Sequence, residues 1–270
     1  MVLKSEKIQV FQMTFKKRLL YLIIQFNRFI LKRKFIHIWL GPLRGYTWST
    51  SYNYDYFTGD YEAEDTLRQF YSWLKPGTVF YDLGGNVGFF SVLAAKYINY
   101  GTIYSFEPIP YNIVVFKKHL ELNRKKINCR DIQILPYAIS NKEGEVAISH
   151  DPFAIEGNTY IKSVYLTTTE KIQVQCRSID GLLNEGYQKP DVIKIDVEGA
   201  EYDVLLGAAK TLAAYKPNIL LATHDCHLPG VQQKCIEFLT GLGYQVQHTG
   251  KYKKYMSGLD DYIAIYSGKL

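Results

Sequence analysis

One apolar run of the chain carries an acid near its end, and a glycine-rich turn follows it. Asp82 stands near the end of the run 79–83, and a helical apolar pattern begins after the turn. Because glycine tolerates positive φ and has no side chain, such a strand–loop–helix lets the backbone approach a ligand closely. Leu83 occupies the place of the first glycine of the dinucleotide fingerprint, and a carboxylate is a poor neighbour for a pyrophosphate. A carboxylate suits a cation such as S-adenosylmethionine, so the pattern predicts a methyl-donor site with contacts from Asp82, Gly84, Gly85, Asn86 and Gly88.

A second carboxylate, Glu107, stands at the end of the next expected strand, 102–107. Its separation from Asp82 is close to the roughly 20 residues at which a βαβ unit places an acid on a ribose. Two hydroxyls of a vicinal diol can donate to one carboxylate, so we assign Glu107 to the ribose of the donor. Nicotinamide cofactors use the same contact, and Asp82 is therefore the residue that separates the two kinds of cofactor.

A group of acids follows the run 192–195. Asp196 stands at the tip of this strand, and we predict that it orients the donor or the acceptor. Lys194 shares its face of the strand, and a buried lysine needs a partner, which we expect to be Asp196. We assign Glu198 to the substrate. Glu198 and Glu201 also suit the first turn of a helix, where the helix dipole favours carboxylates.

A histidine, His224, directly follows the last of the expected parallel strands, 218–223. An imidazole with an ordinary pKa near ~6.5 suits the removal of a proton from a hydroxyl as methyl transfer proceeds. We therefore predict that His224 is the catalytic base, that it contacts the substrate, and that it faces Asp196. A structural role for this histidine, or a metal held by His224, Asp225 and His227, are the alternatives; we assign no metal ligand.

The net charge of +6 is concentrated in the first 34 residues. This segment holds nine lysines and arginines and one glutamate, so the rest of the chain is slightly acidic. Nucleic-acid binding normally requires a basic face, so the charge disfavours a nucleic-acid partner and leaves a small-molecule or glycan acceptor. The four cysteines are scattered, which indicates reduced thiols in a cytoplasmic protein.

Residues 1–40 form a basic leader. Its apolar run 19–31 is interrupted by Asn27 and Arg28 and is shorter than the roughly 20 residues that span a bilayer. With basic residues on both sides, the segment 16–34 suits a helix that lies peripherally on an anionic membrane, at its inner face. The same pattern suits a helix packed on the domain or on a second subunit, and the sequence leaves these alternatives open.

Strand-length apolar runs alternate with helical patterns over residues 41–270, which we interpret as a single α/β domain. This alternation predicts a doubly wound, mostly parallel sheet that binds ligands at the carboxyl ends of its strands. Residues 143–178 break the alternation and predict a β insertion or edge hairpin, a candidate lip over the substrate. We expect strands at 79–83, 102–107, 132–137, 191–196, 218–223, 244–248 and 262–266, and helices at 62–74, 88–97, 110–122, 199–213 and 231–241.

These motifs together resemble the FkbM-type family of S-adenosylmethionine-dependent methyltransferases over residues 40–266. The matching stretches are Gly59–Glu62, Asp82–Gly88, Phe106–Pro108 with Asn112, Pro136–Ser140 and, most specific, Lys194–Glu201. The resemblance implies a seven-stranded Rossmann-like sheet with an antiparallel last strand, and O-methylation of a sugar, glycan or secondary metabolite. It also implies donor contacts from Pro108, Asn112 and Ala138.

The chain departs from the family pattern at two places, and two other functions stay open. Gly85 replaces the usual alanine, and Ala222-Thr223 precede His224 where many members carry a glutamate. A nicotinamide-dependent oxidoreductase shares the ribose carboxylate, but Asp82 and the missing glycine argue against it. A non-catalytic, membrane-associated module would bind the donor without turnover. The sequence leaves the oligomeric state open.

Overall fold

The computed structural model describes residues 15–52, 55–59, 61–129, 131–150, 170–251 and 258–268. The chain divides into two compact units, Met1–Tyr61 and Glu62–Leu270. This division lies further along the chain than the boundary expected at residue 40, because a short strand before that residue, 35–37, pairs with one after it, 47–49, within the first unit.

The first unit contains a helix that continues into a short π-helical turn, and a two-stranded antiparallel sheet. Gly41 and Gly59 approach each other so closely that a Cβ on Gly41 would lie 2.5 Å from the Cα of Gly59, so both positions require glycine. The described elements are α2(Phe15–Gln25), η1(Phe26–Ile30), β1(Phe35–His37), β2(Thr47–Ser49) and α3(Asp55–Thr58). Within the described residues, none of the helices is long and apolar enough to cross a membrane.

The second unit is built on a seven-stranded sheet with the order β11-β12-β10-β9-β3-β4-β5. The five strands from β10 to β5 are parallel, and β12 runs antiparallel between β10 and β11. This confirms the predicted α/β class and the antiparallel last strand. The bounds are β3(Val79–Leu83), β4(Thr102–Phe106), β5(Asp131–Leu135), β9(Val192–Ile195), β10(Asn218–His224), β11(Tyr244–Lys251) and β12(Leu259–Tyr266).

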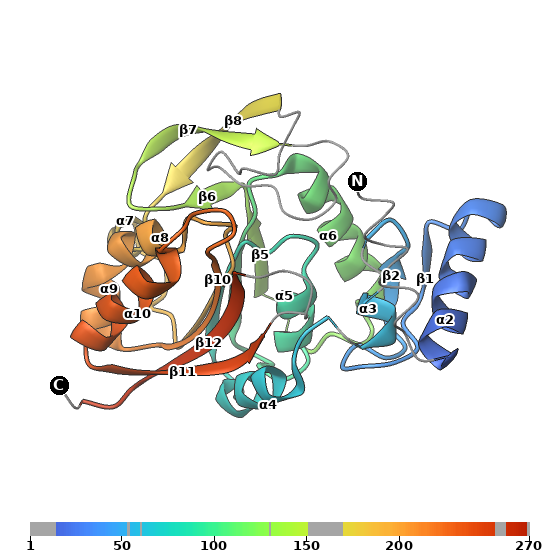
Figure 1. Ribbon diagram of the computed structural model, residues 1–270, viewed down its shortest axis with the longest axis horizontal. Helices are drawn as coiled ribbons and strands as arrows, with labels where there is room; N and C mark the ends of the chain where they lie inside the picture. The colour runs from blue at the N-terminus through green and yellow to red at the C-terminus, as the bar shows by residue number, and fades with distance from the viewer. Residues whose placement is uncertain are drawn as a thin grey trace. The chain divides into compact units, whose positions relative to one another are not determined.

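Helices cover both faces of this sheet, with α4, α5 and α6 on one side and α7 to α10 on the other (Figure 1). The predicted helix 199–213 is two helices, because Gly207 packs against Ser140 and the chain then bends at Ala208, with φ −113°. The bounds are α4(Glu64–Trp73), α5(Phe89–Ala94), α6(Pro110–Asn123), α7(Ile179–Asn184), α8(Glu201–Gly207), α9(Ala209–Tyr215) and α10(Val231–Gly241).

The predicted β insertion forms a separate small sheet, β6-β8-β7, rather than an edge of the main one. The strands β7(Gly144–His150) and β8(Glu170–Arg177) pair antiparallel, as expected. The third strand is β6(Tyr137–Ile139). The sequence pattern predicts a single strand over 132–137, which combines most of β5 with the first residue of β6. The two separate at Pro136, which lacks the N–H that a continuous strand needs.

The strands at the centre of the sheet are mostly apolar, with Asp82 on β3 and Lys194 on β9 as the charged exceptions, and every residue of β3, β4 and β9 is buried. Such runs are typical of parallel strands covered on both faces. Because β3, β4, β9 and β10 are parallel, their carboxyl ends meet at one edge of the sheet. The polar residues that follow these strands are therefore brought together.

Gly88 and Gly230 each adopt a left-handed backbone conformation directly before a helix, but only Gly88 is closely packed. Comparing their alanine variants therefore distinguishes the cost of backbone strain from the cost of a steric clash. Gly88 caps α5 with φ +91°, and a Cβ there would lie 2.1 Å from the ring of Phe116. Gly230 caps α10 with φ +83° and has open space around it. In both alanine variants the left-handed backbone conformation destabilises the protein by ~1–2 kcal/mol. Only in Gly88→Ala does the clash with Phe116 add overpacking of ~1–3 kcal/mol.

We therefore expect Gly88→Ala to lower the free energy of unfolding in urea by about 1–3 kcal/mol more than Gly230→Ala does. Equal losses in the two variants would contradict the close packing of the glycine loop on α6.

Candidate functional site

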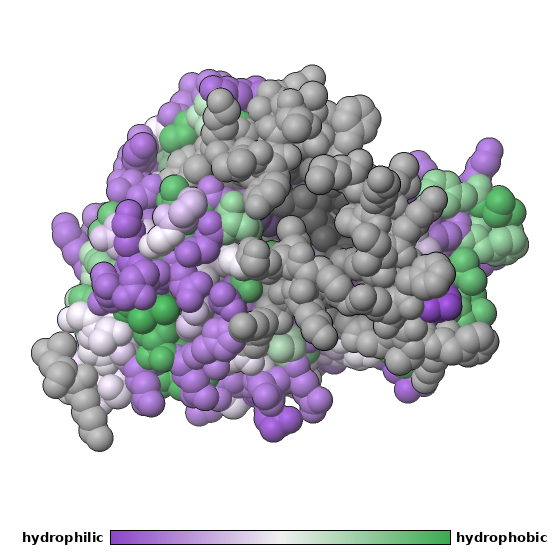
Figure 2. Space-filling view, in the orientation of Figure 1, coloured by the Kyte–Doolittle hydropathy of each residue, from purple (hydrophilic) through white to green (hydrophobic). Residues whose placement is uncertain are grey.

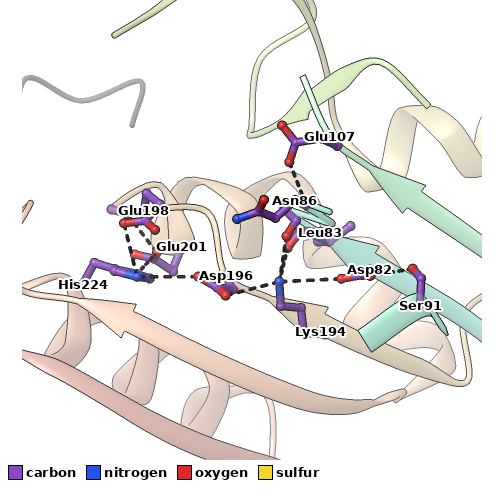
Figure 3. A network of polar contacts seen from close by, with 12 residues as sticks. Asp82, Leu83, Asn86, Ser91, Glu107, Lys194, Asp196, Glu198, Glu201 and His224 are labelled. Carbon is purple, nitrogen blue, oxygen red and sulfur yellow. Dashed lines mark hydrogen bonds and ion pairs between the residues drawn. The ribbon is translucent and has the colours of Figure 1, made fainter. Parts of the chain in front are cut away.

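A buried lysine lies at the centre of the strand ends (Figure 3). Its ammonium is 3.3 Å from Asp196 Oδ2 and 3.6 Å from Asp82 Oδ1, and it donates to the carbonyl of Gly84 at 2.8 Å. Burial alone would lower the pKa of Lys194, but the carboxylates of Asp196 and Asp82 raise it above its ordinary value. The predicted pairing of Lys194 with Asp196 is confirmed, and Asp82 joins it.

Asp82 lies beneath the glycine loop rather than on the surface of the site. Its Oδ2 accepts a hydrogen bond from Ser91 Oγ at 2.5 Å, and its Oδ1 faces Lys194. The carboxylate thus belongs to a buried charge pair, and its Oδ1 accepts no hydrogen bond among the described residues.

The glycines of the loop are required by the packing of the protein itself. A Cβ on Gly84, whose φ is +76°, would lie 1.9 Å from the carbonyl oxygen of Asp196. A Cβ on Gly85 would lie 2.0 Å from Ser105 Oγ. Asn86 has φ +47°, and its backbone N–H donates to Glu107. The loop therefore lies directly on the ends of β4 and β9.

Glu107 is buried and is held by three donors. Its Oε2 accepts from the backbone N–H of Asn86 at 2.8 Å, and its Oε1 accepts from the N–H of Ile109 at 2.8 Å and from Asn112 Nδ2 at 3.1 Å. These bonds use three of the roughly four acceptor positions of a carboxylate, so one position remains for a ribose hydroxyl rather than two. Burial raises the pKa of Glu107 to about 7.

The residues assigned to the donor by resemblance alone are Pro108, Asn112 and Ala138. Asn112, in the first turn of α6, positions the Glu107 carboxylate through its side-chain amide. Pro108 follows Glu107 and is half-buried. Ala138, on β6, packs against a small apolar cluster that includes Ile109.

His224 ends β10 and is surrounded by carboxylates. Its Nδ1 lies 2.8 Å from Glu201 Oε1, and its Nε2 lies 3.5 Å from Asp196 Oδ1 and 3.4 Å from Glu198 Oε2. Burial alone would lower the pKa of His224, but Glu198 and Glu201 raise it well above its ordinary value. His224 thus faces Asp196 at the carboxyl edge, as the sequence predicts, but the expectation of an imidazole with an ordinary pKa is wrong, because carboxylates surround the ring.

Glu201 was expected to cap a helix, and it does more. Its Oε1 accepts the backbone N–H of Gly199 at 2.8 Å and also contacts the ring of His224. The side chain is completely buried. Glu201 therefore fixes the orientation of the imidazole, a role that the sequence analysis did not predict.

The metal alternative of the sequence analysis, His224 with Asp225 and His227, is not formed. Asp225 Oδ1 accepts the backbone N–H of Gln232 at 2.8 Å, so its carboxylate serves the start of α10. His227 Nδ1 lies 3.1 Å from Glu198 Oε2. Among the residues that the structure describes, the group of possible ligand atoms that converges is Asp196, Glu198 and His224, with all three atoms within 4.8 Å of one another.

Two further acids, Glu62 and Asp261, act on the same cluster. Burial and the carboxylate of Asp196 raise the pKa of Asp261 to about 7. Burial and Asp261 raise the pKa of Glu62 well above its ordinary value. Glu62 ends one of the stretches that carry the resemblance, so the sequence held a signal for it. Asp261 had no such signal, because only its pairing opposite Ala222 on β10 brings it to the site.

Comparison with known proteins gives one family match and several distant relatives. Residues 82–246 match the Methyltransferase FkbM domain. The chain is similar to Methyltransferase 1 of Beauveria bassiana, with 27% identity over 144 residues that cover 47% of this chain and 56% of that protein. It is also similar to the hexuronic acid methyltransferase AglP of Haloferax volcanii, with 27% identity over 150 residues, 55% of this chain and 57% of that protein.

The chain thus spans little more than half the length of these two curated relatives. Among solved structures, a methyltransferase FkbM from Methylobacillus flagellatus is similar with a TM-score of 0.45 and 17% identity, over 70% of this chain and 44% of that chain.

Proposed function

Because the chain belongs to the FkbM methyltransferase domain family, we propose that it transfers the methyl group of S-adenosylmethionine to a hydroxyl of a sugar, a glycan or a secondary metabolite. One observation carries the proposal. The glycine loop with Glu107 and the Asp196–His224 pair lie at the same edge of the sheet, joined through Lys194. A donor end and an acceptor end are therefore neighbours.

The donor end fits S-adenosylmethionine in charge and in hydrogen-bonding capacity. Within the described part of the chain, Asn86 Oδ1 and Ser105 Oγ are buried without a hydrogen-bond partner. Glu107 keeps one acceptor position, and Asp82 and Asp196 add negative charge to that of Glu107. The other residues assigned to the donor end shape the loop or support the residues that contact the donor. They are Asp82, Gly84, Gly85, Gly88, Pro108 and Ala138. When bound, the cofactor supplies an electrophilic methyl on its sulfonium.

The acceptor end offers carboxylates that solvent reaches. The side chains of Asp196 and Glu198 are 28% and 25% exposed, against 6% for His224. Carboxylates face both ring nitrogens of His224, and the raised pKa makes the ring a poor proton acceptor. We therefore assign proton acceptance to the carboxylate of Asp196, with His224 as its positively charged partner. Glu198 lies beside them and would bind the acceptor. Holding the hydroxyl oxygen in line with the methyl supplies much of the rate.

The loop after β9 favours oxygen as the atom that is methylated. Enzymes that methylate nucleic-acid amino groups are expected to carry an Asn/Asp-Pro-Pro-aromatic loop there, and this chain has Asp196-Val197-Glu198-Gly199. The chain outside its basic leader is slightly acidic, which disfavours nucleic acid as the acceptor. The relative named as a hexuronic acid methyltransferase supports a sugar acceptor.

Calorimetric titration with S-adenosylhomocysteine and NAD in parallel tests the proposed donor. Binding of S-adenosylhomocysteine alone, together with methyl transfer to a sugar or glycan library, supports the proposal. Binding of NAD alone favours the oxidoreductase. Binding of S-adenosylhomocysteine with no product from any hydroxyl acceptor favours the non-catalytic module.

Glu107 makes donor affinity depend on pH. Its pKa is about 7, and only the ionised carboxylate keeps its last acceptor position for the ribose. The ionised fraction falls as the pH drops through 7, so we expect S-adenosylhomocysteine to bind about tenfold more weakly at pH 6 than at pH 8. Glu107→Gln should bind roughly tenfold or more weakly at pH 8 and lose this pH dependence.

Asp261 provides the matched control, because its pKa is also about 7. Asp261→Asn should keep the pH dependence of the wild type. If that variant loses the pH dependence and Glu107→Gln retains it, the ribose assignment is wrong.

The acceptor end is tested by turnover. We expect His224→Ala to lower the turnover number about 10²–10⁴-fold, with the affinity for S-adenosylhomocysteine near the wild-type value. If Asp196 and His224 act together, the double variant Asp196→Asn/His224→Ala should be no slower than the slower single variant. His248→Ala is the control, since the His248 ring lies 3.0 Å from Asp260 and makes no described contact with Asp196, Glu198 or His224. Full activity of His224→Ala would refute the role.

A further inference from the structure

From the ligand atoms that converge on His224, we infer a binding site for one divalent metal ion of the zinc type, formed by Asp196 Oδ1, Glu198 Oε2 and His224 Nε2. The inference rests on the proposed function, because it places the ion where the acceptor oxygen is bound. An ion held by three protein ligands keeps a position open for another oxygen. With the ion bound, Asp196 Oδ1 and His224 Nε2 would hold the metal instead of accepting the proton. The ion would bind and orient the acceptor hydroxyl and lower its pKa, so that the proton passes to water.

The spacing of the three atoms fits one small ion. His224 Nε2 lies 3.5 Å from Asp196 Oδ1 and 3.4 Å from Glu198 Oε2. Bonds of ~2.0–2.2 Å in tetrahedral geometry place neighbouring ligand atoms roughly 3.3–3.5 Å apart. The two carboxylate oxygens lie within 4.8 Å of each other. One imidazole with two carboxylates favours zinc-like ions over calcium or magnesium, which prefer oxygen ligands alone.

The surroundings of the three ligands hold them in place. Glu201, the buried first residue of α8, lies 2.8 Å from the other ring nitrogen of His224, Nδ1. This is the carboxylate–histidine arrangement that orients metal-binding imidazoles. Glu201 Oε2 is itself buried without a hydrogen-bond partner among the described residues. Lys194 holds Asp196 by Oδ2 and leaves Oδ1 toward His224. His227 contacts Glu198.

The negative charge of the cluster also points to a cation. Three carboxylates, those of Asp196, Glu198 and Glu201, surround the imidazole of His224. The other basic groups that face them are His227, beside Glu198, and Lys194, which is shared between Asp196 and Asp82. Buried carboxylates need compensating positive charge. A divalent ion between Asp196, Glu198 and His224 supplies it at the point where these side chains meet.

The test uses the intact protein, stripped with EDTA and titrated with Co²⁺ as a spectroscopic substitute for Zn²⁺. We expect one saturable site with the visible absorption bands of low-coordinate Co²⁺, displaced by Zn²⁺. Glu198→Gln and His224→Ala should each weaken binding at least tenfold, and Glu201→Gln should weaken it about 10–100-fold through loss of orientation. His248→Ala, which alters an exposed histidine–carboxylate pair, should bind as the wild type does.

The absence of a saturable Co²⁺ site, or Co²⁺ binding that survives both Glu198→Gln and His224→Ala, would overturn the inference. Thermal unfolding of each variant shows that it is folded. Methyl transfer at the full rate in EDTA would also show that the metal has no role in the reaction, and it would leave the proposed function intact. Failure to bind S-adenosylhomocysteine would remove the proposed function, and the Co²⁺ spectrum would still decide on the site.

A different observation, in the first unit, carries a second inference. The helix α2 and the turn η1 carry a stripe of large apolar side chains that are between 37% and 66% exposed. Ile24 and Asn27, on the same segment, are buried, so the stripe faces outward. Figure 2 shows apolar side chains along this part of the chain. The stripe consists of Leu19, Leu22, Ile23, Phe26, Phe29 and Ile30, spaced as on one face of a helix.

We infer that this stripe docks on an anionic lipid surface. Lys32, Arg33 and Lys34 follow it directly and are exposed. An exposed stripe of this size marks an interaction surface, and the basic run selects the partner. A second copy would bring the same positive charges together, whereas an anionic leaflet attracts them with ~1 kcal/mol for each lysine or arginine.

Vesicle flotation of the full-length protein tests this surface. We expect recovery with vesicles that contain phosphatidylserine, recovery that falls as salt rises, and little recovery with phosphatidylcholine alone. Phe29→Ser/Ile30→Ser and Lys32→Gln/Arg33→Gln/Lys34→Gln should each lower recovery several-fold. Tyr100→Ser, which removes an exposed aromatic ring of the second unit, is the control.

Equal recovery of the wild type and both variants would overturn the lipid assignment. A dimer in size-exclusion chromatography that Phe29→Ser/Ile30→Ser dissociates, without vesicle binding by the wild type, would instead assign the stripe to a second copy.

Discussion

The site depends on one buried ammonium. Lys194 comes from the central strand β9 and joins two carboxylates, Asp82 and Asp196, while it donates to the carbonyl of Gly84. Removing one partner of a buried ion pair typically destabilises a protein by about 3–5 kcal/mol, because the other charge is left unpaired. Lys194 therefore fixes the glycine loop on the end of β9, and this position of the loop lets the backbone N–H of Asn86 reach Glu107.

The acids around this ammonium outnumber the cations that face them. The carboxylates of Asp261 and Glu62 are close enough to Asp196 to interact with it, and burial together with neighbouring carboxylates raises the pKa of each. Such a cluster stays stable by holding protons, by pairing with lysine or histidine, or by binding a cation. A positively charged donor at one end and a metal ion at the other would relieve the same excess of negative charge. The composition of the site, more than any single contact, explains why a cationic ligand suits it.

Much of this site could be predicted because parallel strands collect their carboxyl ends at one edge. Asp82, Glu107, Asp196 and His224 each stand at the end of an apolar run, so the strand pattern alone placed them together. The contact between Glu201 and His224 could not be predicted, because it depends on how the first turn of α8 faces β10. Helix capping explained Glu201 without reference to any other strand.

Other features depend on register or on packing, which a single sequence does not specify. Asp261 reaches the site because β12 inserts antiparallel beside β10 and pairs opposite Ala222. A shift of one residue would turn its side chain to the other face of the sheet. The break between α8 and α9 likewise depends on Gly207 meeting Ser140, which lies far away in the sequence. The local sequence pattern predicts one continuous helix over 199–213, because no residue near position 208 forbids it.

Asp196 connects the two ends of the site through its two oxygens. Oδ2 lies with Lys194 and therefore with the glycine loop, and Oδ1 faces His224 and therefore the acceptor end. Loss of its charge leaves Lys194 with Asp82 alone, so the donor end changes as well as the acceptor end. Among the residues that the structure describes, His224 makes no direct contact with Lys194, so its loss acts on one side only. In the proposed function, the carboxylate of Asp196 is thus the point at which donor binding and the chemistry of the acceptor are coupled.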